Sequence, residues 1–134
     1  LTSGQLAKQT GAGVEALRFY ERQGLLAEPV RTASGYRQYP AEAVERVRFI
    51  RRAQLLGFHL KEIKELLALR ADPEADRHAV REKAVAKLAD IDQKIKDLEA
   101  MKCELTRLVA VCSGSGPAAQ CPIITAIGNE TRPS

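Results

Sequence analysis

The apolar residues of the first seventy positions recur every three or four residues, in short runs that glycine or proline interrupts. This spacing predicts short amphipathic helices. The first helix is capped by Thr2 or Ser3 and ends at Gln9, and the second covers residues 14–23 before Gly24 stops it. A glycine-containing turn joins the two helices, which is the signature of a helix-turn-helix.

A short hairpin and two further helices are predicted after this pair. Residues 28–39 contain proline, glycine and two tyrosines, and they predict a two-stranded hairpin with its tip near residues 33–35. A third helix starts near Pro40 and ends at Gly57, and a fourth covers residues 60–70. The apolar residues expected to face the core of this head are Leu6, Ala7, Val14, Leu17, Phe19, Val44, Val47, Ile50, Ala53, Leu56, Ile63, Leu66 and Leu67.

Residues 74–111 contain neither glycine nor proline and predict one helix about 55 Å long. An apolar stripe of that length needs a helical partner, and the chain offers no second helix of similar length. Pairing with a second copy predicts a coiled-coil homodimer, and packing on the chain's own head is the alternative. Cys103 lies beside the stripe, where we expect a small buried side chain. The stripe consists of Ala84, Leu88, Ile91, Ile95, Leu98, Leu105 and Val109.

The charge of the chain is unevenly distributed. Residues 1–70 hold twelve Lys and Arg against seven Asp and Glu, whereas residues 71–134 hold nine against ten. A basic first half predicts an anionic partner, most simply nucleic acid, although a solvated basic surface would have the same composition. The sequence shows neither a signal peptide nor a long apolar run, so we expect a cytoplasmic protein without a membrane partner.

Two cysteines follow the long helix. Cys112 and Cys121 are separated by small and flexible residues, and Pro122 can begin a short helix that ends near Ile127. A cysteine at the start of a helix is favoured as the thiolate. Two thiolates on a short loop suit a soft metal ion, and two-coordinate sulfur ligation suits monovalent coinage metals. Two inert cysteines are the alternative.

Four segments together closely resemble the MerR family of metal-responsive transcription regulators. They are RFYERQGLL, RTASGYRQYP, VRFIRRAQLLGFHLKEIKELL and the ending C…CPII, and they occur in the family's order. The resemblance covers all but residues 129–134. The segment ADPEADRH and the CPII ending are nearest to the CueR-like copper-efflux branch, and the mercury branch ends in a similar loop.

The resemblance implies a mainly α fold. Its parts are a winged helix-turn-helix head over residues 1–70, an antiparallel coiled-coil dimerisation helix over 71–111, and a metal-binding loop with a short helix over 112–128. A tail, 129–134, completes the chain.

The resemblance also implies a mechanism. A homodimer binds double-stranded promoter DNA, and binding of the metal makes it distort the DNA so that RNA polymerase can start transcription. Deforming DNA to this degree costs about 1–6 kcal/mol. The family's DNA contacts fall on matching residues of the second helix and the wing, where arginines and tyrosines can bond to phosphate. These residues are Arg18, Tyr20, Arg31, Tyr36, Arg37 and Tyr39.

The metal expected from the resemblance is Cu(I), Ag(I) or Au(I) on Cys112 and Cys121. Mercury- and lead-type members carry a third cysteine at the start of the long helix, and here that position is Arg77, followed by His78. Arg77 of the partner subunit would offset the negative charge of a bis-thiolate complex, or would simply be exposed. The eight residues between the cysteines match the mercury branch, so Hg(II) or a divalent ion assisted by His78 remains an alternative.

Other functions fit the sequence less well. It contains no Ser-His-Asp set, phosphate-binding loop or paired carboxylates in a recognisable context, so we expect no enzyme. A thiol redox sensor using Cys112 and Cys121 stays open, as does a DNA-binding protein that responds to no effector.

Overall fold

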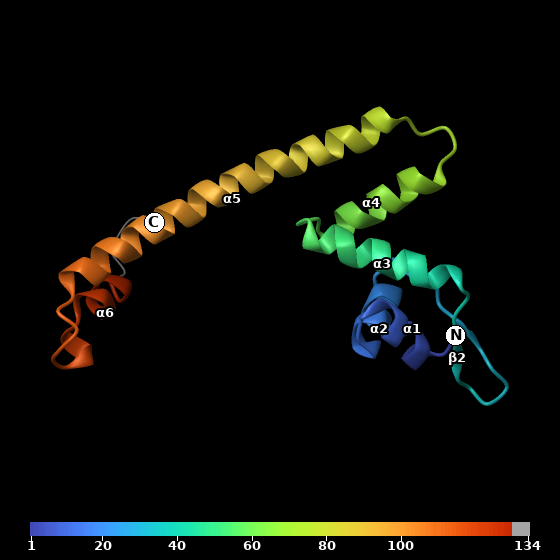
Figure 1. Ribbon diagram of the computed structural model, residues 1–134, viewed down its shortest axis with the longest axis horizontal. Helices are drawn as coiled ribbons and strands as arrows, with labels where there is room; N and C mark the ends of the chain where they lie inside the picture. Colours follow the sequence, from blue (N-terminus) through green and yellow to red (C-terminus); the bar gives the residue numbers. More distant parts are fainter. Residues whose placement is uncertain (130–134) are drawn as a thin grey trace. The chain divides into compact units, whose positions relative to one another are not determined.

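The computed structural model describes residues 1–129, which form a mainly helical fold with a small two-stranded sheet (Figure 1). The predicted tail falls, apart from Asn129, outside the described residues. The chain divides into two compact units, residues 1–87 and the part that begins at Leu88. The elements are α1 (Ser3–Thr10), α2 (Val14–Arg22), β1 (Val30–Arg31), β2 (Arg37–Gln38), α3 (Glu42–Leu55), α4 (Leu60–Ala71), α5 (Arg77–Val111), the 3₁₀ turn η1 (Ala118–Gln120) and α6 (Pro122–Ile127).

The core of the first unit lies between α3 and the helices on either side of it. Val47 and Ile50 of α3 are fully buried, as are Leu6, Leu17 and Ile63 of the other helices. Burying a side chain of this size contributes about 1.5–3 kcal/mol. The spacing of apolar residues therefore predicted the helices and most of this core correctly.

Two residues expected in the core are exposed at the surface. Phe19 is 39% exposed and Leu56 is 66% exposed, whereas Tyr20 is buried. Phe19 occupies the position before Tyr20, and one step along a helix turns a side chain by about 100°. Since Tyr20 faces inward on α2, Phe19 cannot share its face.

Arginines of α3 donate to main-chain carbonyls of the helix-turn-helix. Arg48 Nη2 donates to the carbonyl of Gln9 at 2.9 Å, and Arg51 Nη1 donates to that of Thr10. A cation at these positions compensates the unpaired carbonyls at the C-terminal end of α1. Gly11 follows with φ 75°, and a Cβ there would lie 2.6 Å from Arg51 Nη1, so glycine makes room for the guanidinium.

The long helix α5 begins at Arg77, three residues later than predicted. Before it, the carboxylates of Asp72 and Asp76 accept hydrogen bonds from the backbone N–H groups of Glu74 and His78. Short side chains that bond to nearby main chain favour turns over a helix interior, which explains the later start.

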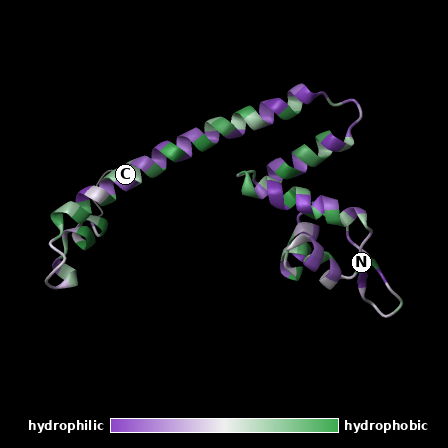
Figure 2. Cartoon of the chain, in the orientation of Figure 1, coloured by the Kyte–Doolittle hydropathy of each residue, from purple (hydrophilic) through white to green (hydrophobic). Residues whose placement is uncertain are grey.

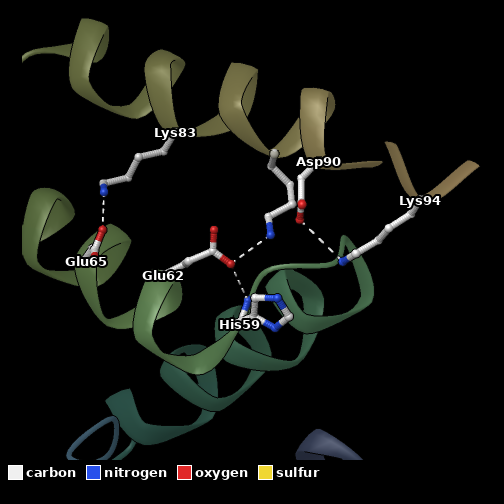
Figure 3. A network of polar contacts seen from close by, with 7 residues as sticks. His59, Glu62, Glu65, Lys83, Asp90 and Lys94 are labelled. Carbon is white, nitrogen blue, oxygen red and sulfur yellow. Dashed lines mark hydrogen bonds and ion pairs between the residues drawn. The ribbon is translucent and has the colours of Figure 1, made fainter. Parts of the chain in front are cut away.

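Ion pairs connect the first turns of α5 to α4. Lys83 pairs with Glu65, and Lys87 Nζ lies 2.8 Å from Glu62 Oε1 (Figure 3). Glu62 also accepts a hydrogen bond of 2.8 Å from the backbone of His59, which completes the cap of α4. Lys87 is only 4% exposed, so its charge depends on these contacts.

Hydrophobic and hydrophilic residues are interspersed along α5 (Figure 2). Much of the predicted stripe is exposed in the single chain, including Leu88, Ile95, Leu98, Leu105 and Val109. Cys103 is also exposed, so the expectation of a buried side chain is wrong for the isolated chain. Leu108, which the predicted stripe omitted, is buried. Among residues 1–129, no helix combines the length and apolarity that crossing a membrane requires.

The pair between Lys87 and Glu62 gives a prediction for stability. The hydrogen bond from Lys87, followed by the one from the His59 backbone, lowers the pKa of Glu62 below its ordinary value of 4.5. Because the folded-state pKa is lowered, the ionised carboxylate stabilises the fold above that pH, and the effect is lost as the pH falls through the lower pKa. We expect Glu62→Gln to reduce the free energy of unfolding by about 1 kcal/mol at neutral pH and by less in acid.

Urea denaturation at equal protein concentrations and several pH values would measure this difference. Glu74→Gln, at an exposed position, is the matched control and should change little. A loss for Glu62→Gln that persists unchanged well below pH 4.5 would contradict the role given to the charge.

Candidate functional site

The second helix of the helix-turn-helix presents one predicted contact residue to solvent and buries another. Arg18 is exposed on α2. Tyr20 is 5% exposed, and its hydroxyl donates to Gln54 Oε1 of α3 at 2.9 Å. Burial raises the pKa of Tyr20, against a smaller lowering by the charge of Arg51, so the hydroxyl stays protonated and remains a donor.

The wing is the hairpin of β1 and β2, in which Val30 pairs with Gln38 and Arg31 with Arg37. Gly35, with φ 85°, sits at its tip, and its N–H donates to the carbonyl of Thr32 at 2.9 Å. This backbone conformation suits glycine, as the predicted tip requires.

The four predicted contact residues of the wing also divide into two kinds. Arg31 is exposed and donates to the carbonyl of Gly35 at 2.9 Å, and Tyr36 is 71% exposed. Arg37 instead pairs with Glu21 of α2, and the Tyr39 hydroxyl donates to the other oxygen of Glu21 at 2.6 Å. Tyr39 is 2% exposed.

The six residues therefore belong to two sets. The side chains of Arg18, Arg31 and Tyr36 are available to a partner, whereas Tyr20, Arg37 and Tyr39 are engaged inside the head. Sequence reasoning missed Glu21 and Gln54, which receive the internal bonds. Glu21 lies between Arg18 and Arg22 in the RFYERQGLL segment. An acidic residue in such a basic segment was a visible signal of an internal ion pair.

The two cysteines of the second unit lie together. Cys112 Sγ and Cys121 Sγ are 3.1 Å apart, and both residues are half-buried. Cys112 directly follows α5, and Cys121 immediately precedes α6, as predicted. The loop between them turns through Gly114 and Gly116, whose φ angles of 81° and 106° favour glycine.

The surroundings of Cys121 stabilise its thiolate. A hydrogen bond from Cys112, followed by one from the backbone N–H of Ile123, lowers the pKa of Cys121, with a smaller contribution from Ile124. Soft metal ions bind thiolate sulfur, so this donor set fits such an ion.

Arg77 and His78 lie at the start of α5, in the first unit. His78 Nε2 is 3.0 Å from Glu82 Oε1, one helical turn along, and both side chains are largely exposed. Within residues 1–129, no group of three or more His, Cys, Asp or Glu is arranged to hold a metal ion. The thiol pair thus stands without a third such donor among the described residues.

The fold and the arrangement of its head define a DNA-binding regulator of the winged helix-turn-helix class. The family model for the MerR helix-turn-helix regulatory proteins matches residues 1–69, and the model for MerR DNA binding matches residues 44–108. The chain belongs to the MerR family, as its sequence motifs indicated.

Several relatives resemble the chain over most of its length. The transcriptional regulator CueR of Yersinia pestis is 41% identical over 122 residues, which cover 91% of this chain and 87% of the relative. The mercuric resistance operon regulatory protein of Serratia marcescens is 41% identical over 133 residues, covering 99% and 91%. A crystal structure of the regulator PbrR691 from Ralstonia metallidurans in complex with lead(II) aligns with a TM-score of 0.79 at 34% identity, covering 95% and 98%.

The contact between the two thiols gives a second prediction. We expect Cys121 to react with iodoacetamide at a lower pH in the unchanged protein than in Cys112→Ala, because the substitution removes the hydrogen bond that favours the thiolate. Metal-free, reduced protein is alkylated across a pH series and the modified peptides are quantified by mass spectrometry.

Cys103→Ala is the matched control, because Cys103 lies on α5 outside this loop, and it should leave the pH profile of Cys121 in place. A profile of Cys121 that does not move in Cys112→Ala would refute the interaction.

Proposed function

We propose that this chain is a metal-responsive transcription activator that binds promoter DNA as a homodimer and takes a soft metal ion on Cys112 and Cys121. The observation that carries the proposal is the 3.1 Å approach of the two thiols on a loop of a MerR-family chain. Relatives that are regulators of copper-type and mercury-type systems by name support a metal as the signal.

The proposed division of labour follows the elements. Residues 1–70 bind DNA, residues 71–111 form the dimerisation helix, and residues 112–128 form the metal loop. The exposed apolar residues of α5 support the homodimer, because a long apolar stripe in water favours association with another helix. We propose an antiparallel arrangement, in which each metal loop meets the start of the partner's α5.

The DNA surface is proposed to consist of the six arginines and tyrosines in two roles. Arg18, Arg31 and Tyr36 are exposed and can contact phosphate, with the arginines forming charge-assisted hydrogen bonds. The remaining three, Tyr20, Arg37 and Tyr39, hold α2 and the wing in the position that this contact needs.

A metal on the two sulfurs would act by stabilising one arrangement of the dimer over another. It can shift that equilibrium only by the difference between its affinities for the two arrangements. The favoured dimer would distort the promoter and place its elements within reach of RNA polymerase. The chain's own contribution is the wing and helix surface, which hold DNA in both arrangements.

We favour Cu(I), Ag(I) or Au(I) as the metal, because a pair of thiolates is a complete ligand set for a two-coordinate monovalent ion. Hg(II) is the alternative within the same site, supported by the spacing of the cysteines and by the mercury-type relatives. A divalent ion bound by the two cysteines and assisted by His78 of the partner subunit is a second alternative.

A thiol redox sensor is the second candidate function. The observation that favours it is again the short distance between two free thiols, together with the lowered pKa of Cys121, which favours its thiolate. It differs from metal sensing in requiring no metal, so an oxidant alone should switch the output and a dithiol reductant should reverse it.

A promoter reporter in living cells tests the function. We expect Cu, Ag and Au salts to induce it, and both Cys112→Ser and Cys121→Ser to lose most of the induction because one sulfur cannot complete the site. Cys103→Ser is the matched control and should respond like the unchanged protein. Induction by Hg, Zn or Cd and not by the monovalent ions would overturn the metal assignment, and unchanged output in both loop variants would overturn metal sensing altogether.

Arg77 provides a separate prediction about the charge of the site. A monovalent ion on two thiolates leaves one net negative charge, and the sequence from Val111 to Asn129 contains no charged residue to balance it. If Arg77 of the partner subunit supplies the balance, Arg77→Ala should weaken Ag(I) binding several-fold and weaken it less at high salt. Competition titration of the purified dimer measures the affinity, Arg81→Ala is the control from the next turn of α5, and equal affinities would refute the role.

A further inference from the structure

Glu21 is a carboxylate placed between the second helix of the helix-turn-helix and the wing. Its side chain is only 7% exposed, although it belongs to a segment rich in arginine. One oxygen pairs with Arg37, and the other accepts the hydroxyl of Tyr39 at 2.6 Å. A buried carboxylate is stable only when it is paired and hydrogen-bonded, and here both oxygens are used to join α2 to β2 and to the residue after it.

The pairing of the wing explains why such a carboxylate is needed. Arg31 and Arg37 stand directly opposite each other in the antiparallel ladder. Like charges at opposed positions destabilise a strand pair. The structure separates them, since Arg31 donates to the carbonyl of Gly35 at the tip while Arg37 turns to Glu21. Hydrogen bonds to Tyr39 and then to Glu21 raise the pKa of Arg37.

Arg31 and Arg37 therefore differ in how available their charges are to a phosphate. Arg31 is exposed, and within residues 1–129 its side chain bonds only to a neutral carbonyl, so its charge is available. The side chain of Arg37 is 20% exposed, and its charge is already compensated by an ionised partner. A phosphate that took Arg37 would leave the carboxylate of Glu21 buried without its cation, which is unfavourable.

We propose that Glu21 is a positioning residue that retains Arg37 as an internal link, so that Arg31 and not Arg37 neutralises phosphate when the wing meets DNA. This inference rests on the proposed function, because it assigns roles within the proposed DNA surface. It makes Glu21 the residue that fixes the wing relative to α2.

Salt dependence of DNA binding distinguishes the two arginines. Each phosphate that a protein neutralises adds about 0.9 to the steepness of log affinity against log salt concentration. We expect Arg31→Gln to reduce the slope by about 0.9 for each bound head. Arg37→Gln should weaken binding at every salt concentration, because the wing loses its link, and should leave the slope as it is. Fluorescence anisotropy with a labelled DNA duplex of mixed sequence measures both.

Glu21→Gln tests the link from the other side, because the amide keeps the shape of the carboxylate and removes its charge. Arg37 then becomes available to phosphate, so the slope should become steeper by about 0.9 for each bound head. The double variant Glu21→Gln with Arg37→Gln should return to the slope of the unchanged protein. Glu28→Gln changes the net charge equally at an exposed position of the same head and should leave the slope in place. Thermal unfolding of each variant, at equal concentration, reports any loss of fold separately from the slope.

The outcomes separate this inference from the function on which it rests. If the unchanged protein binds DNA with a steep salt dependence but Arg37→Gln flattens the slope as much as Arg31→Gln does, Arg37 contacts phosphate and the inference is wrong. A Glu21→Gln variant that folds, binds more weakly and shows no steeper slope would also overturn it. Binding by the unchanged protein that is absent or independent of salt would overturn the DNA-binding function itself.

Discussion

Packing against the apolar face of α3 is the interaction on which the head depends. α1 and α4 contact this helix, and Tyr20 joins α2 to it through Gln54. Each fully buried aliphatic side chain of that face contributes about 1.5–3 kcal/mol, whereas a typical net hydrogen bond contributes about 0.5–1.5 kcal/mol. The apolar face therefore provides most of the stability. The arginines on the neighbouring faces of α3 have a different role, which is to position α1. Their bonds to the carbonyls of Gln9 and Thr10 fix where α1 ends relative to the core.

The surface proposed for DNA depends on which of its positive charges are already paired within the head. A basic surface repels itself, and the head reduces this repulsion where a carboxylate pairs with a cation, as Glu21 does with Arg37. Arginines of α3 also donate to main-chain carbonyls, which fixes the direction of their side chains. Only part of the positive charge counted in the first seventy residues is therefore directed outward. Counting charges along the sequence identifies the kind of partner, but it overestimates how many cations can meet a phosphate.

The periodicity of the sequence predicted every helix of the head, the hairpin and the helix after Cys121, because these depend on local spacing and on glycine and proline. What it could not predict are the directions of individual side chains. Tyrosines are expected on a contact surface, yet tertiary packing buries Tyr20 and Tyr39. Their hydroxyls donate to Gln54 and Glu21, respectively. The prediction for Cys103 was wrong in the opposite direction. The residue was expected to be buried but is exposed, since in a single chain nothing covers that side of the long helix.

The thiol pair sets a condition on any ion that binds there. The two sulfurs lie 3.1 Å apart, and a hydrogen bond that joins them through one proton lowers the pKa of Cys121. Binding a metal must displace that proton, which makes affinity depend on pH. Because the loop has no charged residue of its own, a divalent ion would leave it neutral, whereas a monovalent ion would leave a negative charge. Discrimination between the two by charge therefore depends on a cation from outside the loop, and this is the physical reason for proposing that Arg77 of a second copy has that role.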